Sequence, residues 1–257
     1  MSAIPTGDLA GRVALVTGSS RGIGAVIAAD LAQHGAAVAV HGRDAAATSA
    51  VAAGIQRGGG TAIAVTGDVT RSSDLDHIRE QVQATVGPVD VLVANAGGSH
   101  IAPGPIESIT EDDWRAVIDG NLLATFLTLK AFLPGMKQRR RGSIITLGSS
   151  AGRRANGLAP APYSAAKAGV ILLTQQVAAQ AGPFGVRANC LAPETILTES
   201  LRSRIPPAKQ EAMAGAHPLR RLGTPDDVAD AATFLAGERS AWITGAVLDI
   251  TGGAALV

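Results

Sequence analysis

Short apolar runs alternate with longer amphipathic stretches along the chain, from residue 13 to residue 250. The apolar runs are rich in Val, Ile and Ala and too short for helices, so they predict strands buried on both faces. These strands are expected at residues 13–17, 36–41, 62–66, 89–94, 143–147, 186–191 and 247–250. The stretches between them predict helices at residues 23–34, 44–57, 72–85, 111–137, 163–180 and 225–236. With right-handed crossovers, the alternation predicts an α/β fold, a doubly wound seven-stranded parallel sheet with helices on both faces.

The alternation lapses at residues 193–217, a stretch that contains Pro206 and Pro207. Irregular segments of this length in a compact domain are usually lids or binding loops, so we expect a substrate lid near residues 194–217. A variable surface excursion is the alternative. No linker, repeat or low-complexity segment divides the chain, and residues 1–257 are expected to form a single domain.

Charge is nearly balanced, with 22 Lys and Arg residues against 21 Asp and Glu, and the densest basic run spans only residues 139–141. This balance argues against nucleic acid or a membrane surface as a partner and favours a small molecule. The single cysteine, Cys190, excludes an intramolecular disulfide, and we expect no metal site. The first eleven residues lack the basic start and apolar run of a secretory signal, and no other segment is expected to reach membrane-spanning length. The expected location is cytoplasmic.

The first predicted strand leads into TGSSRGIG, residues 17–24, and then into a helix. Small residues let the backbone approach a pyrophosphate closely, and the helix N-terminus supplies free N–H groups for its negative charge. The spacing G-x-x-x-G-x-G differs from the general dinucleotide fingerprint and resembles that of the short-chain dehydrogenase/reductase family, whose fold is Rossmann-like. The resemblance implies cofactor contacts from Gly18, Ser20, Arg21, Gly22, Ile23 and Gly24.

The end of the second predicted strand, VAVHGRD, bears on which nicotinamide cofactor binds. An acidic residue there holds a ribose 2′-hydroxyl, whereas an arginine accommodates a 2′-phosphate. Gly42 occupies the place where NAD-preferring members of the family usually have Asp, and Arg43 follows it. Arg43 and Arg21 facing one phosphate dianion favour NADP(H). Asp44 is the competing feature, because NAD(H) would be preferred if its side chain turned inward.

Three further segments match cofactor contacts of the family. Asp68 and Val69 resemble the pair that contacts adenine, and ANAG, residues 94–97, resembles N-N-A-G with Ala in place of the first Asn. The segment NCLAPETILTES, residues 189–200, resembles P-G-x-x-x-T with Glu194 in place of Gly. The resemblance therefore adds these expected cofactor contacts: Asp68, Val69, Asn95, Ala96, Gly97, Tyr163, Lys167, Pro193, Ile196 and Thr198.

The stretch PYSAAKAG, residues 162–169, holds the only tyrosine of the chain, four residues before a lysine. On a helix, Tyr163 and Lys167 lie on the same face. A free phenol has a pKa of about 10, and a nearby ammonium favours the phenolate, so we expect a lowered pKa and a usable acid–base group. Tyr163 would give its proton to a carbonyl oxygen in reduction and take an alcohol proton in oxidation. The resemblance implies that Lys167 also hydrogen-bonds the nicotinamide ribose.

Two serines, Ser149 and Ser150, follow the fifth predicted strand, and one of them is expected to polarise the substrate carbonyl. The S-x-x-G pattern of the family selects Ser149, three residues before Gly152, whereas its usual interval of thirteen residues to the tyrosine selects Ser150. We favour Ser149, because an extra residue in the loop of residues 153–162 is easier to accept than a slipped strand end. Asn121 matches a helix asparagine of the family whose carbonyl kinks the helix and holds a water that links the lysine to solvent. The resemblance thus implies a catalytic tetrad of Asn121, Ser149, Tyr163 and Lys167.

These features favour an NADP(H)-dependent oxidoreductase that transfers a hydride between nicotinamide and a carbonyl or secondary alcohol. The pattern most resembles ketoreductases of the 3-oxoacyl-[acyl-carrier-protein] reductase branch. The alternatives are an NAD-dependent secondary-alcohol dehydrogenase and, from another class, a catalytically silent dinucleotide-binding protein. Members of the family usually form tetramers, so the resemblance implies a homotetramer, or a homodimer, built on the long helices. Their apolar faces include Leu122, Leu127, Leu172 and Val177.

Overall fold

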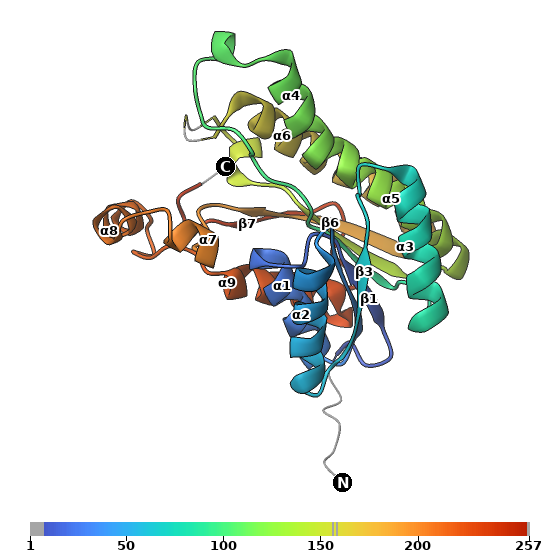
Figure 1. Ribbon diagram of the computed structural model, residues 1–257. Coiled ribbons are helices and arrows are strands. Elements are labelled where there is room, and N and C mark those ends of the chain that lie inside the picture. Colours follow the sequence, from blue (N-terminus) through green and yellow to red (C-terminus); the bar gives the residue numbers. More distant parts are fainter. Residues whose placement is uncertain (1–7, 156, 158, 256–257) are drawn as a thin grey trace.

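The strands form one parallel sheet in the order β3-β2-β1-β4-β5-β6-β7 (Figure 1). The computed structural model describes residues 8–155, 157 and 159–255. Its strands are β1 (Val13–Val16), β2 (Ala37–Gly42), β3 (Thr61–Thr66), β4 (Val91–Ala94), β5 (Gly142–Leu147), β6 (Val186–Pro193) and β7 (Val247–Ile250). The predicted fold class is confirmed, and every predicted strand is present with its ends shifted by two residues or fewer.

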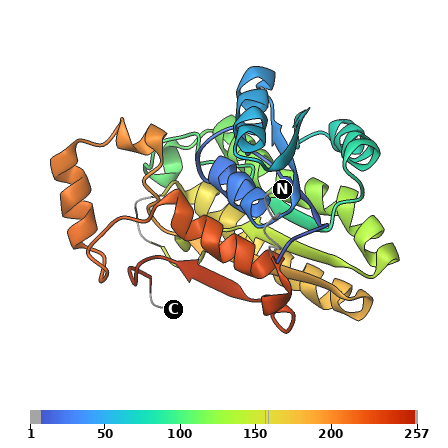
Figure 2. The same cartoon turned by 90° about the horizontal axis from the view of Figure 1, so that it is seen from below.

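Helices cover both faces of the sheet (Figures 1 and 2). One face carries α1 (Gly22–Gln33), α2 (Ala45–Arg57) and α9 (Pro225–Ala236), with α1 and α9 side by side, and the other carries α3 (Ser72–Thr85), α5 (Ala124–Arg139) and α6 (Ala161–Ala181). Successive strand residues point to opposite faces, so Val16 packs with Ile27 in one buried cluster and Leu15 packs with Phe132 in the other. The two clusters hold the sheet between its helix layers.

The predicted helix of residues 111–137 is interrupted in the structure. It consists of α4 (Glu111–Ile118), a π turn (Asp119–Leu123) and α5, which continue one another over 29 residues. By length and composition this stretch is apolar enough to cross a membrane, so the expectation that no segment reaches that length is wrong. Its apolar side chains contribute to the core of the domain: Leu129, Phe132 and Met136 are buried against the sheet.

Two short helices occupy the stretch expected to be irregular, residues 193–217. They are α7 (Glu199–Arg202) and α8 (Pro207–Gly215), and α8 stands away from the sheet in both views (Figures 1 and 2). Pro207 begins α8 because its missing N–H lies among donors that have no partner inside a helix. Pro206 and Pro207, which belong to the stretch expected to be irregular, therefore lie at the start of a helix.

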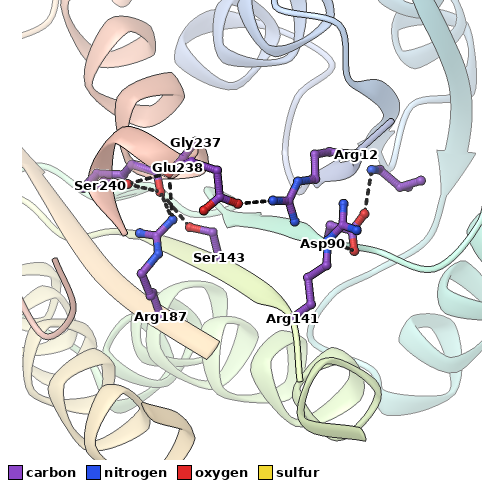
Figure 3. A network of polar contacts seen from close by, with 10 residues as sticks. Arg12, Asp90, Arg141, Ser143, Arg187, Gly237, Glu238 and Ser240 are labelled. Atoms are coloured by element: carbon purple, nitrogen blue, oxygen red, sulfur yellow. Dashed lines mark hydrogen bonds and ion pairs between the residues drawn. The ribbon is translucent and has the colours of Figure 1, made fainter. Parts of the chain in front are cut away.

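A polar network closes the edge of the sheet where the strands begin (Figure 3). Arg187, at the start of β6, donates to the carbonyls of Leu235 at 2.9 Å and Gly237 at 3.1 Å, at the end of α9. Arg12 pairs with Glu238, and Asp90 forms an ion pair with Arg141 and accepts a hydrogen bond from the backbone N–H of Val13. This network joins the amino ends of the strands to the end of α9. The carboxyl ends of the strands, at the opposite edge of the sheet, take no part in it.

Replacing Arg187 by Met is expected to lower the free energy of unfolding by about 2 kcal/mol, because charge-assisted hydrogen bonds to partly buried carbonyls are lost. Urea denaturation measures this loss. Arg239→Met is the control, since Arg239 is exposed nearby and its loss should cost less than about 0.5 kcal/mol. Equal losses in the two variants would mean that the network does not stabilise this edge.

Candidate active site

A cavity of about 1030 Å³ lies at the carboxyl edge of the sheet. Ligands bind at this edge in open α/β sheets, where the strand order reverses between β1 and β4. The expected site residues that line the cavity are Gly18, Ser20, Arg21, Ile23, Gly24, Arg43, Asp68, Val69, Asn95, Ala96, Gly97, Ser149, Tyr163, Lys167, Pro193, Ile196 and Thr198. Gly22 and Asn121 are the expected site residues that do not line it. The structure thus brings nearly all of the expected residues to one place.

The glycine-rich turn between β1 and α1 is packed so closely that side chains would not fit. A Cβ on Gly24 would lie 2.5 Å from the Asn95 amide nitrogen, and one on Gly18 would lie 2.8 Å from the Cα of Ala96. Gly18 and Gly22 also have positive φ angles of 65° and 59°. The Asn95 side chain clamps the turn by donating to the carbonyls of Thr17 at 2.9 Å and Gly18 at 3.0 Å. An uncrowded backbone at the start of α1 is what a dinucleotide pyrophosphate requires.

The end of β2 has no room for a side chain at position 42. A Cβ on Gly42 would lie 2.6 Å from the Thr48 hydroxyl and 2.8 Å from the Ser20 Cβ. Arg43 follows and lines the cavity. Asp44, the competing feature of the sequence, caps α2 by accepting from the backbone N–H of Ala47 at 3.1 Å. One oxygen of its carboxylate is therefore engaged with its own helix, although Asp44 also lines the cavity.

Asp68 is fixed in the loop after β3. Its carboxylate accepts from the backbone N–H of Thr70 at 2.9 Å and from the Thr70 hydroxyl at 2.8 Å. The Thr70 N–H holds the pKa of Asp68 below its usual value, with smaller contributions in the same direction from the charges of Arg43 and Arg71. An ionised carboxylate therefore stands beside Arg43 at this end of the cavity.

Asn121 lies behind the cavity wall, in the π turn between α4 and α5. Its side chain accepts from the backbone N–H of Gly98 at 3.1 Å and donates to the Gly98 carbonyl at 2.9 Å. A Cβ on Gly97 would lie 2.5 Å from the Asn121 Oδ1 and 3.4 Å from the Lys167 Nζ. The asparagine therefore supports the loop after β4 next to the lysine. The water expected on its carbonyl stays a prediction.

The serine turn after β5 presses directly against α6. A Cβ on Gly152 would lie 2.6 Å from the backbone nitrogen of Ala168, so the S-x-x-G glycine lets the turn meet the helix that carries Tyr163 and Lys167. The Ser149 hydroxyl hydrogen-bonds to Tyr163 and also donates to the Pro193 carbonyl at 3.5 Å. Ser150 lines the cavity but is buried. Ser149 is thus the serine placed against the tyrosine; part of the loop predicted to be longer, residues 156 and 158, lies outside the described residues.

The expectation that Lys167 lowers the pKa of Tyr163 is wrong for this structure. Burial raises the pKa of Tyr163, and the hydrogen bond with Ser149 opposes this rise only in part. Burial also lowers the pKa of Lys167 to about 8. The Lys167 Nζ donates to the Leu147 carbonyl at 2.7 Å and lies 5.6 Å from the centre of the tyrosine ring. At neutral pH the pair is therefore a protonated phenol beside an ammonium.

The segment after β6 forms the wall opposite the glycine turn. Thr198 caps α7 by accepting from the backbone N–H of Leu201 at 3.3 Å, and its methyl group would lie 3.7 Å from a Cβ on Gly22. Glu194 lines the cavity where the family pattern has Gly, and its backbone N–H donates to the Ile250 carbonyl at 3.1 Å. The backbone at Glu194 thus pairs with the end of β7, whereas the Glu194 Oε2 is buried without a hydrogen-bond partner among the residues that the structure describes.

Several cavity residues were not expected from the sequence. Some of these residues lie in loops next to the family motifs, and nothing in the sequence marked them except that position. His41 could have been found from the sequence, because a titratable residue inside an apolar strand is unusual. The residues missed are His41, Gly67, Thr70, Gly98, His100, Gly120, Leu147, Gly148, Ala151, Ala159 and Thr195.

Comparisons with known proteins agree with this geometry. A family model described as enoyl-(acyl carrier protein) reductase matches residues 18–255. The 7α-hydroxysteroid dehydrogenase of Escherichia coli K12 is 35% identical over 245 residues, which cover 95% of this chain and 94% of that protein. The 3-oxoacyl-[acyl-carrier-protein] reductase of Pseudomonas aeruginosa is 35% identical over 251 residues, covering 96% and 98%. The chain belongs to the short-chain dehydrogenase/reductase family. The resemblance stated from the motifs is thereby confirmed.

Solved structures of this short-chain dehydrogenase/reductase family share the fold closely. A gluconate 5-dehydrogenase from Burkholderia cenocepacia, in complex with NADP and tartrate, has a TM-score of 0.89 at 33% identity and covers 96% of each chain. A 7α-hydroxysteroid dehydrogenase, complexed with NADH and 7-oxo glycochenodeoxycholic acid, has a TM-score of 0.90 at 34% identity and covers 98% of this chain and 97% of that one. This chain is accordingly an oxidoreductase that takes a nicotinamide dinucleotide.

Proposed function

We propose that the protein is an NADP(H)-dependent ketoreductase that transfers a hydride between the nicotinamide and a carbonyl or secondary alcohol. The observation that carries this proposal is the tyrosine hydroxyl, which is bonded to Ser149 at the carboxyl edge of the sheet with the buried Lys167 one turn along α6. A silent dinucleotide-binding protein has no need for this arrangement. We therefore assign catalysis to Asn121, Ser149, Tyr163 and Lys167.

Tyr163 is the proton donor in reduction and the proton acceptor in oxidation. The bound cofactor supplies or accepts the hydride. Because burial raises the pKa of Tyr163, its hydroxyl carries a proton at neutral pH, in the form that protonates a carbonyl oxygen. Ser149 donates a second hydrogen bond that polarises the same oxygen, and the Leu147 carbonyl holds Lys167 one turn along α6. Asn121 holds the loop beside Lys167.

The preference for NADP(H) rests on the end of β2. Position 42 holds Gly in place of the acidic residue that would bind a ribose 2′-hydroxyl, and a Cβ there would crowd Ser20 and Thr48. Asp44 also lines the cavity but directs one carboxylate oxygen to its own helix, where it caps α2. Arg43 and Arg21 both line the cavity and are the cations offered to a 2′-phosphate. The competing activity is NAD-dependent oxidation of a secondary alcohol, which the NADH complex of the hydroxysteroid dehydrogenase favours.

The substrate end of the cavity lies under the proposed lid. Leu201, Ile205 and Met213 line it with apolar surface, and Lys209 adds one cation. This lining suits a carbonyl compound with an apolar body, which includes 3-oxoacyl chains like those of the Pseudomonas relative. We propose that this stretch, residues 194–217, closes over the substrate within the single domain.

We also propose a homotetramer, or a homodimer, in the cytoplasm. Of the apolar residues expected at the interface, Leu172 on α6 is 60% exposed, whereas Val177 is buried in the core. Phe126 on α5 is 45% exposed. The exposed side chains of Leu172 and Phe126 support an interface on α6 and α5.

Equilibrium binding of NADPH and NADH to the purified protein tests the cofactor preference. We expect the Kd for NADPH to be at least about tenfold lower than that for NADH, because two guanidinium groups meet the 2′-phosphate. Tighter binding of NADH would favour the NAD-dependent dehydrogenase. Binding of neither dinucleotide would contradict the proposed function.

A further inference from the structure

His41 ties together two loops that lie on either side of the cavity. It stands near the end of β2, is 2% exposed and lines the cavity. Its Nδ1 accepts from the backbone N–H of Gly18, in the glycine turn, at 3.1 Å. Its Nε2 lies 3.2 Å from the carbonyl of Gly67, in the loop that leads to Asp68. One imidazole ring therefore spans the distance between the glycine turn and the loop after β3.

These two contacts fix the protonation of the ring. An N–H group donates to Nδ1, so Nδ1 carries a lone pair, and a carbonyl accepts at Nε2, so Nε2 carries the proton. If Nδ1 also carried a proton, its N–H would face the backbone N–H of Gly18, and neither group could accept a hydrogen bond. Burial lowers the pKa of His41 to about 4, against smaller opposing effects of the Gly67 carbonyl and the Asp68 charge, which agrees with a neutral ring.

The backbone of His41 holds the same turn. Its carbonyl accepts from the Ser19 N–H at 2.7 Å, and its N–H donates to the Ser19 hydroxyl at 2.9 Å. The Ser19 hydroxyl in turn donates to the Val16 carbonyl at 2.6 Å. The backbone bonds can form with any residue at position 41, whereas the bonds to Gly18 and Gly67 need this side chain.

We propose that His41 is a positioning residue that sets the spacing between the glycine turn and the Gly67–Asp68 loop, and thereby the affinity for the adenosine half of the cofactor. The inference rests on the proposed function, because it supposes that this end of the cavity takes a phosphorylated adenosine. His41 acts through the two loops and leaves the hydride and proton transfers to other residues.

The test measures binding of adenosine 2′,5′-bisphosphate by calorimetry at pH 7. His41→Phe keeps a ring but removes both hydrogen bonds, and we expect its Kd to rise at least about tenfold, since neither loop is then held at its distance from the other. The kcat at saturating NADPH should stay within about threefold, so that the loss appears in KM for the cofactor. His41→Asn offers an Oδ1 to the Gly18 N–H and should recover part of the affinity.

Ser143→Ala is the matched control, because Ser143 is a buried hydroxyl on β5 that donates to the Leu235 carbonyl at the opposite edge of the sheet. Its Tm should fall, while its Kd should equal that of the wild type. If the wild type binds the bisphosphate and His41→Phe binds it within about twofold, the inference is wrong. If the wild type binds neither NADPH nor NADH, the proposed function itself fails.

A measurement on the wild type keeps the inference testable if His41→Phe does not fold. Nitrogen-15 NMR of the histidine rings should show His41 with a proton on Nε2 and a lone pair on Nδ1, unchanged between pH 7 and about 5. A ring that titrates near the ordinary histidine pKa of about 6.5 would overturn the proposed contacts.

Discussion

Replacing Tyr163 by Phe is expected to lower kcat about 10³-fold, because the only group removed is the hydroxyl that exchanges a proton with the substrate. The ring keeps its place beside Lys167, whose Nζ is held by the Leu147 carbonyl. The Kd for NADPH should therefore stay within about twofold of the wild-type value. NADPH oxidation with a ketone substrate measures kcat, and calorimetry measures the Kd.

Ser164→Ala is the control for this substitution. Ser164 is the next residue on α6, and its hydroxyl is outside the cavity lining, so kcat should not change. A Tyr163→Phe enzyme that keeps more than about a tenth of its kcat would mean that another group carries the proton. A loss of NADPH affinity with kcat unchanged at saturating NADPH would assign the tyrosine to cofactor binding alone.

The fold was predictable because the sheet is parallel and buried on both faces. Runs such as VALV at β1 and VLVA at β4 are apolar at every position, and this pattern is specific to such strands. The helix over residues 111–137 was less predictable. Its apolar spacing continues through Asn121, and nothing in the spacing shows that the chain widens into a π turn there.

The candidate site was predictable where a backbone constraint requires one residue type. Gly24 and Gly152 are examples, since any Cβ at either position would collide with neighbouring atoms. The pKa of Tyr163 was not predictable, because the sequence shows that a lysine is near but does not show how much water burial removes. The contacts of His41 also could not be foreseen, since they join loops whose spacing only the folded sheet defines.

Replacing Arg43 by Asp is expected to raise the Kd for NADPH about 100-fold and to change the Kd for NADH by no more than about threefold. The wild-type guanidinium faces the cavity next to Asp68, where it would meet a 2′-phosphate. A carboxylate there replaces attraction of the 2′-phosphate by repulsion, whereas NADH has no 2′-phosphate to repel. Calorimetry with both dinucleotides measures the change.

Arg71→Asp separates a direct contact from a general change of charge. Arg71 also lies close enough to Asp68 to lower its pKa, but it does not line the cavity. Long-range electrostatics would weaken NADPH binding in both variants, whereas a direct contact with the phosphate would weaken it only in Arg43→Asp. Equal weakening of NADPH and NADH by Arg43→Asp would remove the phosphate assignment. Gly42 would then remain the argument against NAD, because the space that Ser20 and Thr48 occupy does not depend on charge.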